Sequence, residues 1–389
     1  MSNMSNMSNI TPVDITVTSA YQTKFGELWD KSLYDLIAET IHGVLKNSSL
    51  EKKDIEIVYF ANKMASQACD QNHISAIINQ ILGTQVPVIR IEAACASGGV
   101  AVSQACLALE SGKYKRALII GAEKMTDLPV DQISYDLMHA ASQQERDAGL
   151  TFVGLYALLA KKYLITFDAT EKDLALPSAK NHKHAQSNPK AQFPFEISVE
   201  KIMASPLVAD PIRLLHCSPI TDGAAAVIIE KNKNNKNKIK IVASAQAGDT
   251  LALSQRETLT TLPATTHSAQ IAYTQAGISP QDISFAEIHD CFSIAEILAV
   301  EDLGFCKKGT GFRAMRNGDF SMGGACPVNI SGGLKACGHP VGATGVKQIV
   351  EIVTQLQNPT HTKLKKPLVG LAHNIGGTGG TAVIHILTK

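Results

Sequence analysis

The chain has 389 residues, of which 45% are hydrophobic and 18% charged, and its formal net charge is +1. These values describe an ordinary soluble globular protein with two or three packed units, and nothing in them suggests a nucleic-acid partner. The repeated Met-Ser-Asn of residues 1–10 lacks the basic and apolar segments of a secretory signal, so we expect a disordered tail there. The longest apolar stretch, 150–160, is too short to span a bilayer. We therefore expect a cytoplasmic protein.

The first half contains a regular succession of predicted elements. A strand at 15–19 is followed by an amphipathic helix at 32–45 and a buried strand at 55–60. A glycine-rich turn then leads into a helix at 100–109 and a strand at 117–120. Units of this kind build sheets that are covered by helices on both faces.

The second half repeats this order. It begins with a strand at 239–245, a helix at 268–276 and a strand at 283–288, and a second glycine-rich turn leads into a helix at 346–356 and a strand at 368–371. The sequence therefore predicts an α/β fold made of two duplicated halves.

A long insertion interrupts the first half. It extends over 123–207 and includes a helical pattern at 152–164, so we expect it to form a small loop domain of its own. The N-terminal half then comprises 11–122 plus 208–235, and the C-terminal half comprises 236–389.

Eight cysteines are distributed along the chain without a CxxC pair or a zinc-ligand spacing. We expect all eight to be free thiols, most of them buried as small hydrophobic side chains. Cys106, on the apolar side of its predicted helix, is an example. No metal site is predicted.

The first glycine-rich turn, Glu92-Ala-Ala-Cys95-Ala-Ser-Gly-Gly99, carries a thiol to the start of a predicted helix. Free N–H groups and the positive end of the helix dipole stabilise a thiolate there. Taken alone, Cys95 would more often be a structural residue. The matching turn in the second half changes this interpretation, because it carries a histidine.

The second glycine-rich turn reads Gly338-His339-Pro-Val-Gly-Ala-Thr-Gly345. Its imidazole can accept a thiol proton or donate a hydrogen bond to an oxyanion. A histidine before proline can also simply close a loop, but so many glycines are unusual in an ordinary loop. If the two halves fold face to face, Cys95 and His339 meet at their junction, as nucleophilic thiol catalysis requires.

Two further motifs end second-half strands. His289-Asp-Cys291-Phe follows the strand at 283–288, where active sites of open α/β sheets collect, although it could equally be a strand end packed into the core. His373-Asn374-Ile-Gly376-Gly-Thr-Gly-Gly follows the last predicted strand and can present N–H groups to negative charge. A phosphate cradle or a plain turn would fit it equally well, though it lacks the nucleotide P-loop signature.

Together these motifs resemble the thiolase family, and most closely its sterol-carrier-protein-type branch and the similar acetyl-CoA acetyltransferases of archaea and some bacteria. The resemblance covers nearly the whole chain and includes Lys180-Asn-His182 in the insertion. It implies a five-layer αβαβα fold with duplicated βαβαβ halves. It also implies acyl transfer between thiols, with coenzyme A as part of the substrate and no metal or redox cofactor.

The resemblance implies a role for each site residue. Cys95 would carry the acyl group as a thioester after His339 takes its proton, and Cys291 would remove an α-proton from acetyl-CoA. His339, with a water held by His289, would stabilise the enolate. Backbone N–H groups of Cys95 and Gly376 would stabilise the tetrahedral intermediates.

Better-known thiolases carry Asn-Glu-Ala-Phe in place of His289-Asp-Cys-Phe, and they have their second cysteine at the position of Asn374. The thiol at Cys291 restores the missing one, as in the sterol-carrier-type branch. The insertion would cover coenzyme A, with His182 and Lys180 as contributors. The family also implies a homodimer or homotetramer.

Two other functions are compatible with these residues. One is a decarboxylating, synthase-type condensing enzyme of the same fold, in which Cys291 would have no task. The other is a module that binds coenzyme A and acts through a pathway-protein partner, with weak catalysis. The intact set of thiols and histidines favours the thiolase reaction over both.

Overall fold

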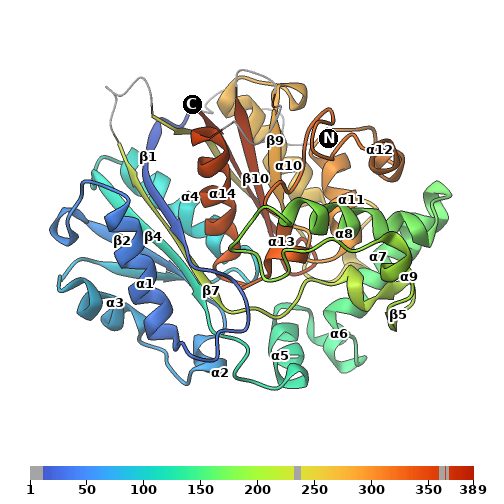
Figure 1. Cartoon of the computed structure of the whole chain (residues 1–389), viewed down its shortest axis with the longest axis horizontal. Coiled ribbons are helices and arrows are strands. Elements are labelled where there is room, and N and C mark those ends of the chain that lie inside the picture. Colours follow the sequence, from blue (N-terminus) through green and yellow to red (C-terminus); the bar gives the residue numbers. More distant parts are fainter. Residues whose placement is uncertain (1–11, 232–237, 359–363, 365–367) are drawn as a thin grey trace.

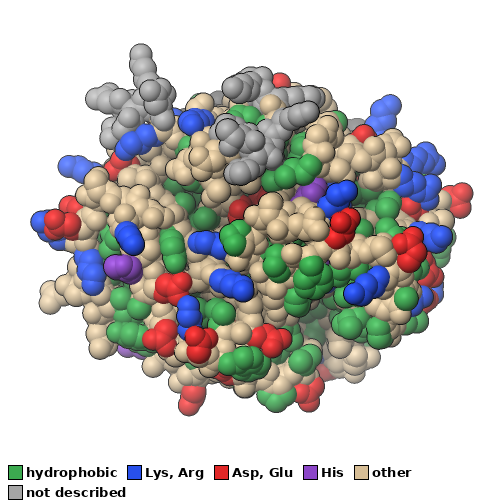
Figure 2. All heavy atoms as spheres, in the orientation of Figure 1, with side chains coloured by type: hydrophobic (Ala, Val, Ile, Leu, Met, Phe, Trp, Pro, Cys, Tyr) green, Lys and Arg blue, Asp and Glu red, His purple; other side chains and the backbone are tan. Residues whose placement is uncertain are grey.

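The computed structural model describes residues 12–231, 238–358, 364 and 368–389. The tail predicted for residues 1–10 lies outside them. Among the described residues, no helix is both long and apolar enough to cross a membrane. Lys, Arg, Asp and Glu side chains are interspersed on the face drawn in Figure 2, in line with the small net charge.

The N-terminal half has the predicted order of strands and helices. Its elements are β1 (Ile15–Gln22), α1 (Leu33–Lys46), β2 (Ile57–Ala61), α2 (Ala65–Ala68), α3 (Ile74–Leu82), β3 (Val88–Ile91), α4 (Ser97–Glu110), β4 (Arg116–Glu123) and β7 (Gly223–Glu230). Within the sheet, β2 pairs in parallel with β3 and β4, and β7 runs antiparallel to β4 and β1. The short edge strand β3 was not predicted, because its four residues are only partly buried and give no clear pattern.

The C-terminal half repeats this plan. Its elements are β8 (Lys240–Gly248), α10 (Pro263–Ala276), β9 (Phe285–Ile288), α11 (Ser293–Asp302), α12 (Gly311–Asn317), α13 (Gly333–Cys337), α14 (Thr344–Gln357), β10 (Val369–Gly376) and β11 (Thr381–Thr388). Here β9 and β10 are parallel, and β11 is antiparallel to β10 and β8. The predicted duplication is confirmed.

The two half-sheets meet through β1 and β8, so the strand order is β3-β2-β4-β7-β1-β8-β11-β10-β9. Helices α4 and α14 pack against each other between the half-sheets, each contacting strands of both halves, whereas α1 covers the outer face of one half and α10 that of the other (Figure 1). The predicted five-layer α/β arrangement is therefore confirmed. The central layer is apolar, with Ala101 and Ala105 of α4 beside Val346 and Ile349 of α14.

The insertion between β4 and β7 is mainly helical. It contains α5 (Val130–Leu137), α6 (Gln143–Asp147), α7 (Phe152–Phe167), α8 (Glu171–Ala185) and α9 (Val199–Met203). The hairpin of β5 (Leu207–Ala209) and β6 (Ile212–Arg213) straddles the boundary predicted at residue 207, and the chain returns to the sheet at Gly223. Helix α7 shares a hydrophobic cluster with α11, which anchors the insertion on the C-terminal half.

The first turns of α4 and α14 approach each other so closely that only glycine fits. A Cβ atom on Gly98 would lie 2.8 Å from the backbone nitrogen of Gly345, and a Cβ atom on Gly345 would overlap the backbone nitrogen of Gly99. Because these neighbours are backbone atoms, they cannot move aside without displacing a helix.

Gly345→Ala should therefore lower the free energy of unfolding by about 1–3 kcal/mol or more, since overpacking at a backbone contact forces the helices apart. Urea unfolding measures this change. Gly26→Ala is the matched control, because a Cβ atom at Gly26 meets nothing within 4 Å. Equal unfolding midpoints for the two variants would show that α4 and α14 are not held by this contact.

Candidate active site

Cys95 lies in a tight turn between β3 and α4. The turn depends on Ala94, whose φ of +52° is in the left-handed region that non-glycine residues rarely adopt. The Ser97 hydroxyl stabilises the turn, since it accepts a hydrogen bond from the Ala93 N–H at 2.9 Å and donates one to the Ala94 carbonyl at 2.6 Å. The half-buried thiol is thereby presented next to the first turn of α4.

His339 lies between α13 and α14, in a loop that the N-terminal half holds in place. The backbone N–H of His339 donates to Thr221 Oγ1 at 3.0 Å, and the backbone N–H of Gly342 donates to the buried carboxylate of Glu123 at 3.1 Å. Gly338 has a φ of +107°, and a Cβ atom there would lie 2.5 Å from the Thr221 side chain. The histidine of one half is thus positioned by residues of the other.

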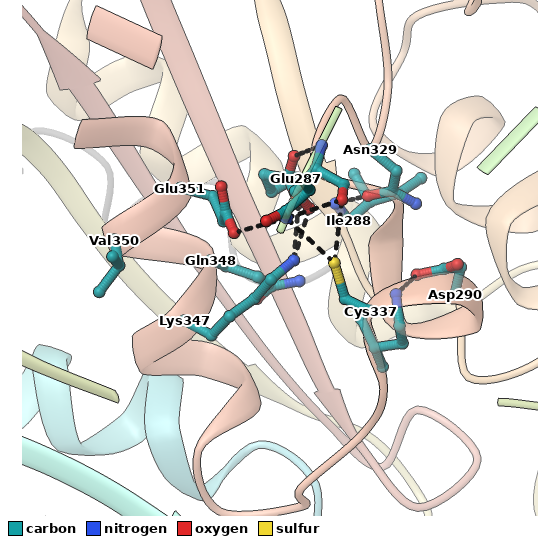
Figure 3. A network of polar contacts seen from close by, with 12 residues as sticks. Glu287, Ile288, Asp290, Asn329, Cys337, Lys347, Gln348, Val350 and Glu351 are labelled. Atoms are coloured by element: carbon teal, nitrogen blue, oxygen red, sulfur yellow. Dashed lines mark hydrogen bonds and ion pairs between the residues drawn. The ribbon is translucent and has the colours of Figure 1, made fainter. Parts of the chain in front are cut away.

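His289 and Cys291 follow β9, and the residue between them ties this strand end to α13. The Asp290 carboxylate accepts hydrogen bonds from the N–H groups of Leu334 at 2.6 Å and Lys335 at 3.1 Å. Figure 3 shows Asp290 below a buried network in which Lys347 of α14 binds Glu287 of β9. The carboxyl end of β9 is therefore held against α13 and α14, the helices that precede and follow His339.

Three of the predicted site residues converge. The sulfur of Cys95 and one ring nitrogen each of His289 and His339 all lie within 4.8 Å of one another. The centroids of the two imidazole rings are 5.0 Å apart, and the ring planes are nearly perpendicular. Cys95, Cys291 and His339 also line one cavity of about 300 Å³, whose other walls are mostly apolar: Met125, Val130, Leu137, Phe152, Val153, Tyr156, Leu214, Ile220, Phe292 and Val341.

Asn374 determines which nitrogen of His289 carries the proton. The Asn374 Oδ1 atom accepts from the Gly99 N–H at 3.0 Å, which fixes the orientation of the amide. Its Nδ2 then donates to the Cys95 carbonyl at 2.9 Å and to His289 Nδ1 at 3.0 Å. Because Nδ1 accepts, the neutral ring carries its proton on Nε2, which has no hydrogen-bond partner among the described residues and is free to donate.

Thr344 assigns the opposite tautomer to His339. The Thr344 hydroxyl donates to the Pro340 carbonyl at 3.0 Å, so it accepts from His339 Nδ1 at 2.7 Å. His339 Nε2 is therefore the free, unprotonated nitrogen. Beside Cys95, one imidazole therefore offers a base and the other a hydrogen-bond donor.

Burial keeps these groups neutral at physiological pH. It raises the pKa of Cys95 to about 11, although the Lys63 charge and a hydrogen bond from the Gly377 N–H act in the opposite direction. It lowers the pKa of His339 to about 3, and that of His289 well below its ordinary value. It also raises the pKa of Cys291 well above its ordinary value. Since the helix N-terminus does not by itself produce a free thiolate, Cys95 needs the base that His339 supplies.

The three converging atoms could also be considered as metal ligands. However, a ligating imidazole must offer a lone pair, and the contact from Asn374 leaves His289 with a proton on its other nitrogen, Nε2. This donor set fits proton transfer better than it fits a metal ion.

Several residues of the site were not assigned a role from the sequence. Tyr156 of the insertion lines the cavity, and the N–H that bonds to the Cys95 sulfur belongs to Gly377, the neighbour of the predicted Gly376. Thr344 lies within a recognised motif, so its position gave a signal. Tyr156 gave none, because an aromatic residue in a helical pattern usually belongs to the core.

Lys180 and His182 lie outside the lining of this cavity. The buried Lys180 ammonium binds Glu296 at 2.9 Å and the Val328 carbonyl at 2.7 Å. The His182 ring is buried too, and its Nδ1 donates to the Phe195 carbonyl. A contact of either residue with coenzyme A stays a prediction.

Comparisons with known proteins match this chain over nearly its whole length. The family described as "Thiolase, N-terminal domain" matches residues 15–233, and "Thiolase C-terminal domain-like" matches residues 245–389. An acetyl-CoA acetyltransferase from Methanothermobacter thermautotrophicus is 45% identical, over 97% of this chain and 100% of that protein.

Solved structures share the fold at lower identity. The Ltp2-ChsH2(DUF35) aldolase has a TM-score of 0.81 at 21% identity, over 97% of this chain and 98% of that one. The Acat5 thiolase from Ascaris suum, in complex with coenzyme A, has a TM-score of 0.76 at 20% identity, over 97% and 100%. At such identities the likeness concerns the fold alone.

The neutral state of Cys95 predicts how its reactivity depends on pH. Because its pKa is about 11, the rate of alkylation by iodoacetamide should still rise between about pH 7 and pH 10. Lys63→Met should slow alkylation further, since it removes a charge that favours the thiolate. Peptide mass spectrometry measures alkylation at Cys95, and the exposed Lys53→Met is the control. A plateau below about pH 8 would contradict the neutral thiol.

Proposed function

This chain belongs to the thiolase family, as its motifs predicted, and we propose that it makes or cleaves a 3-oxoacyl-CoA through an acyl group carried on Cys95. One observation supports this above all: a thiol, a basic imidazole nitrogen and a donating imidazole nitrogen meet within 4.8 Å, beside a cavity that a second thiol also lines. Family membership makes the chain an acyltransferase.

In the first step, the Cys95 S–H bond breaks as the sulfur attacks the thioester carbon of an acyl-CoA, and the proton passes to His339 Nε2. The bond between that carbon and the coenzyme A sulfur then breaks, and the leaving sulfur takes the proton from His339. The hydrogen bond to Thr344 holds the ring in the required tautomer. Backbone N–H groups of Cys95 and Gly376 stabilise the tetrahedral intermediate, as the family resemblance implies. The Gly377 N–H faces the Cys95 sulfur.

In the second step, the Cys291 thiol gives its proton to His339 Nε2, and the resulting thiolate takes an α-proton from acetyl-CoA, so that the electron pair of the C–H bond forms an enolate. The protonated nitrogen of His289, directly or through a water, and His339 stabilise the enolate oxygen. The enolate carbon attacks the acyl-Cys95 carbon, and the carbon–sulfur bond to Cys95 breaks. The Cys95 sulfur takes the proton from His339 Nε2, which returns both thiols and the imidazole to their starting protonation states. Thiolysis is the same path reversed.

A decarboxylating enzyme would not need the second thiol, because loss of carbon dioxide generates the carbanion without a base. Here Cys291 lines the same cavity as Cys95 and His339. This placement favours the thiolase reaction over decarboxylating condensation.

Acetyl-CoA and acetoacetyl-CoA are the proposed substrates, in line with the name of the relative that is 45% identical. Coenzyme A takes part as a substrate component, with no other cofactor. A homodimer or homotetramer in the cytoplasm completes the proposal, and a pathway-protein partner is compatible with it.

The two thiols should be separable by substitution. Cys95→Ala should abolish all acyl transfer, because no thioester can form on the enzyme. Cys291→Ala should still be acylated at Cys95 by acetyl-CoA, which peptide mass spectrometry detects, but should lose condensation and acetoacetyl-CoA cleavage. Cys106→Ala, at a buried cysteine outside the cavity, is the control for the loss of a thiol. Equal cleavage by wild type and Cys291→Ala would refute this division of labour.

The tautomer of His339 should also be testable. Thr344→Val removes the acceptor of the Nδ1–H and leaves this N–H unpaired, so the rate of Cys95 acylation should fall about 10- to 100-fold. Rapid-quench acylation with acetyl-CoA measures the rate. Thr265→Val is a matched control, because it removes a buried hydroxyl that lies 2.9 Å from His373, a ring outside the cavity. An equal loss in both variants would mean that the effect is structural.

A further inference from the structure

Tyr156 brings a hydroxyl group from the insertion into the catalytic cavity. It lies on α7, is completely buried and stacks on Phe292 with ring centroids 4.4 Å apart. Its hydroxyl donates a hydrogen bond to the Gly377 carbonyl at 2.9 Å and is also within hydrogen-bond reach of the Cys291 side chain. A buried tyrosine would be structural if its hydroxyl contacted only the backbone, but this one also reaches a reacting sulfur.

The contacts of Tyr156 connect the two thiols. The Gly377 N–H bonds to the Cys95 sulfur, and the carbonyl of the same residue accepts from Tyr156. A chain of hydrogen bonds thus leads from the Cys95 sulfur, through Gly377 and Tyr156, to the Cys291 sulfur. The proposed reaction uses both of these sulfurs, Cys95 as the nucleophile and Cys291 as the base.

We propose that Tyr156 is a catalytic residue, whose O–H turns from the Gly377 carbonyl to the Cys291 sulfur when Cys291 is a thiolate. This inference rests on the proposed function, in which Cys291 is the base. Burial disfavours a thiolate in this apolar cavity, and a hydrogen bond from the Tyr156 hydroxyl, together with one from the Phe292 N–H, favours the charged sulfur.

No proton leaves Tyr156 in this scheme. When Cys291 is a thiol, its S–H can donate to the tyrosine oxygen while the O–H donates to Gly377. When Cys291 is a thiolate, the O–H rotates about its C–O bond and donates to the sulfur. Burial and the neighbouring Cys291 raise the pKa of Tyr156 well above its ordinary value, so the phenol remains a donor throughout.

Other ionisable groups also act on the Cys291 sulfur. Cys95 and Asp290 both raise the pKa of this thiol, and burial raises the pKa of Asp290 itself to about 7. The Arg256 charge acts on Tyr156, and the imidazoles of His289 and His339 are neutral. Variants must therefore be compared over one pH range in a background without the Cys95 thiol.

The test uses the full chain carrying Cys95→Ala. Iodoacetamide alkylation at Cys291 is followed against pH by peptide mass spectrometry, with and without Tyr156→Phe, which keeps the stacked ring. The midpoint should move upward by about 1–2 pH units when the charge-assisted hydrogen bond is lost. Tyr163→Phe is the matched control, because it removes a buried hydroxyl on the same helix that binds Glu301 instead.

With Cys95 intact, Tyr156→Phe should slow condensation about 10- to 100-fold more than it slows acylation of Cys95 by acetyl-CoA. Acylation that persists in the variant also shows that it is folded. A fluorotyrosine at position 156 tests the opposite direction without removing the hydroxyl. As a stronger donor, it should lower the Cys291 midpoint.

An unmoved Cys291 midpoint in Tyr156→Phe, or an equal shift in Tyr163→Phe, would overturn the role of Tyr156. If Tyr156→Phe does not fold, an unmoved midpoint in the fluorotyrosine protein would do the same. Failure of the proposed function is a separate result, since the wild-type chain would then not be acylated at Cys95.

Discussion

The site depends on one steric constraint, the contact between the glycine-rich first turns of α4 and α14 in the central layer. Gly98 of α4 and Gly345 of α14 leave no room for a Cβ atom on either side. Each turn is preceded by a reactive residue, so the contact that joins the two halves also brings Cys95 and His339 together. Residues 244 positions apart become neighbours because two duplicated units pack face to face.

Around this contact, burial stabilises the neutral forms of the thiols and imidazoles. In an apolar environment a neutral thiol and a neutral imidazole are more stable than a thiolate and an imidazolium. Hydrogen bonds then determine which ring nitrogen of each histidine carries the proton. Thr344 leaves a lone pair on His339, whereas Asn374 leaves a proton on His289. Asn374 takes the place that a second cysteine has in better-known thiolases, and here it orients the histidine that accompanies Cys291. The two positions at which this chain departs from that pattern, His289 and Asn374, are therefore in contact.

The insertion contributes to the site as well as covering it. Helix α7 packs on α11 through apolar side chains, and this packing delivers Tyr156 to the cavity. By contrast, Lys180 and His182 of α8 are occupied by buried contacts with Glu296 and the Phe195 carbonyl. The packing of α7 thus supplies a cavity residue that no sequence motif marks.

The duplicated α/β plan can be predicted from the amino-acid sequence, because alternating apolar segments and two glycine-rich turns recur in the same order in both halves. The sequence also identified the residues that meet, since Cys95, His289, Cys291 and His339 lie in motifs at strand ends and helix starts. The histidine tautomers, the neutral state of the thiols and the position of Tyr156 become visible in the folded chain alone. These properties depend on burial and on hydrogen-bond partners that are distant in the sequence, such as Gly99 with Asn374, and no local pattern records them.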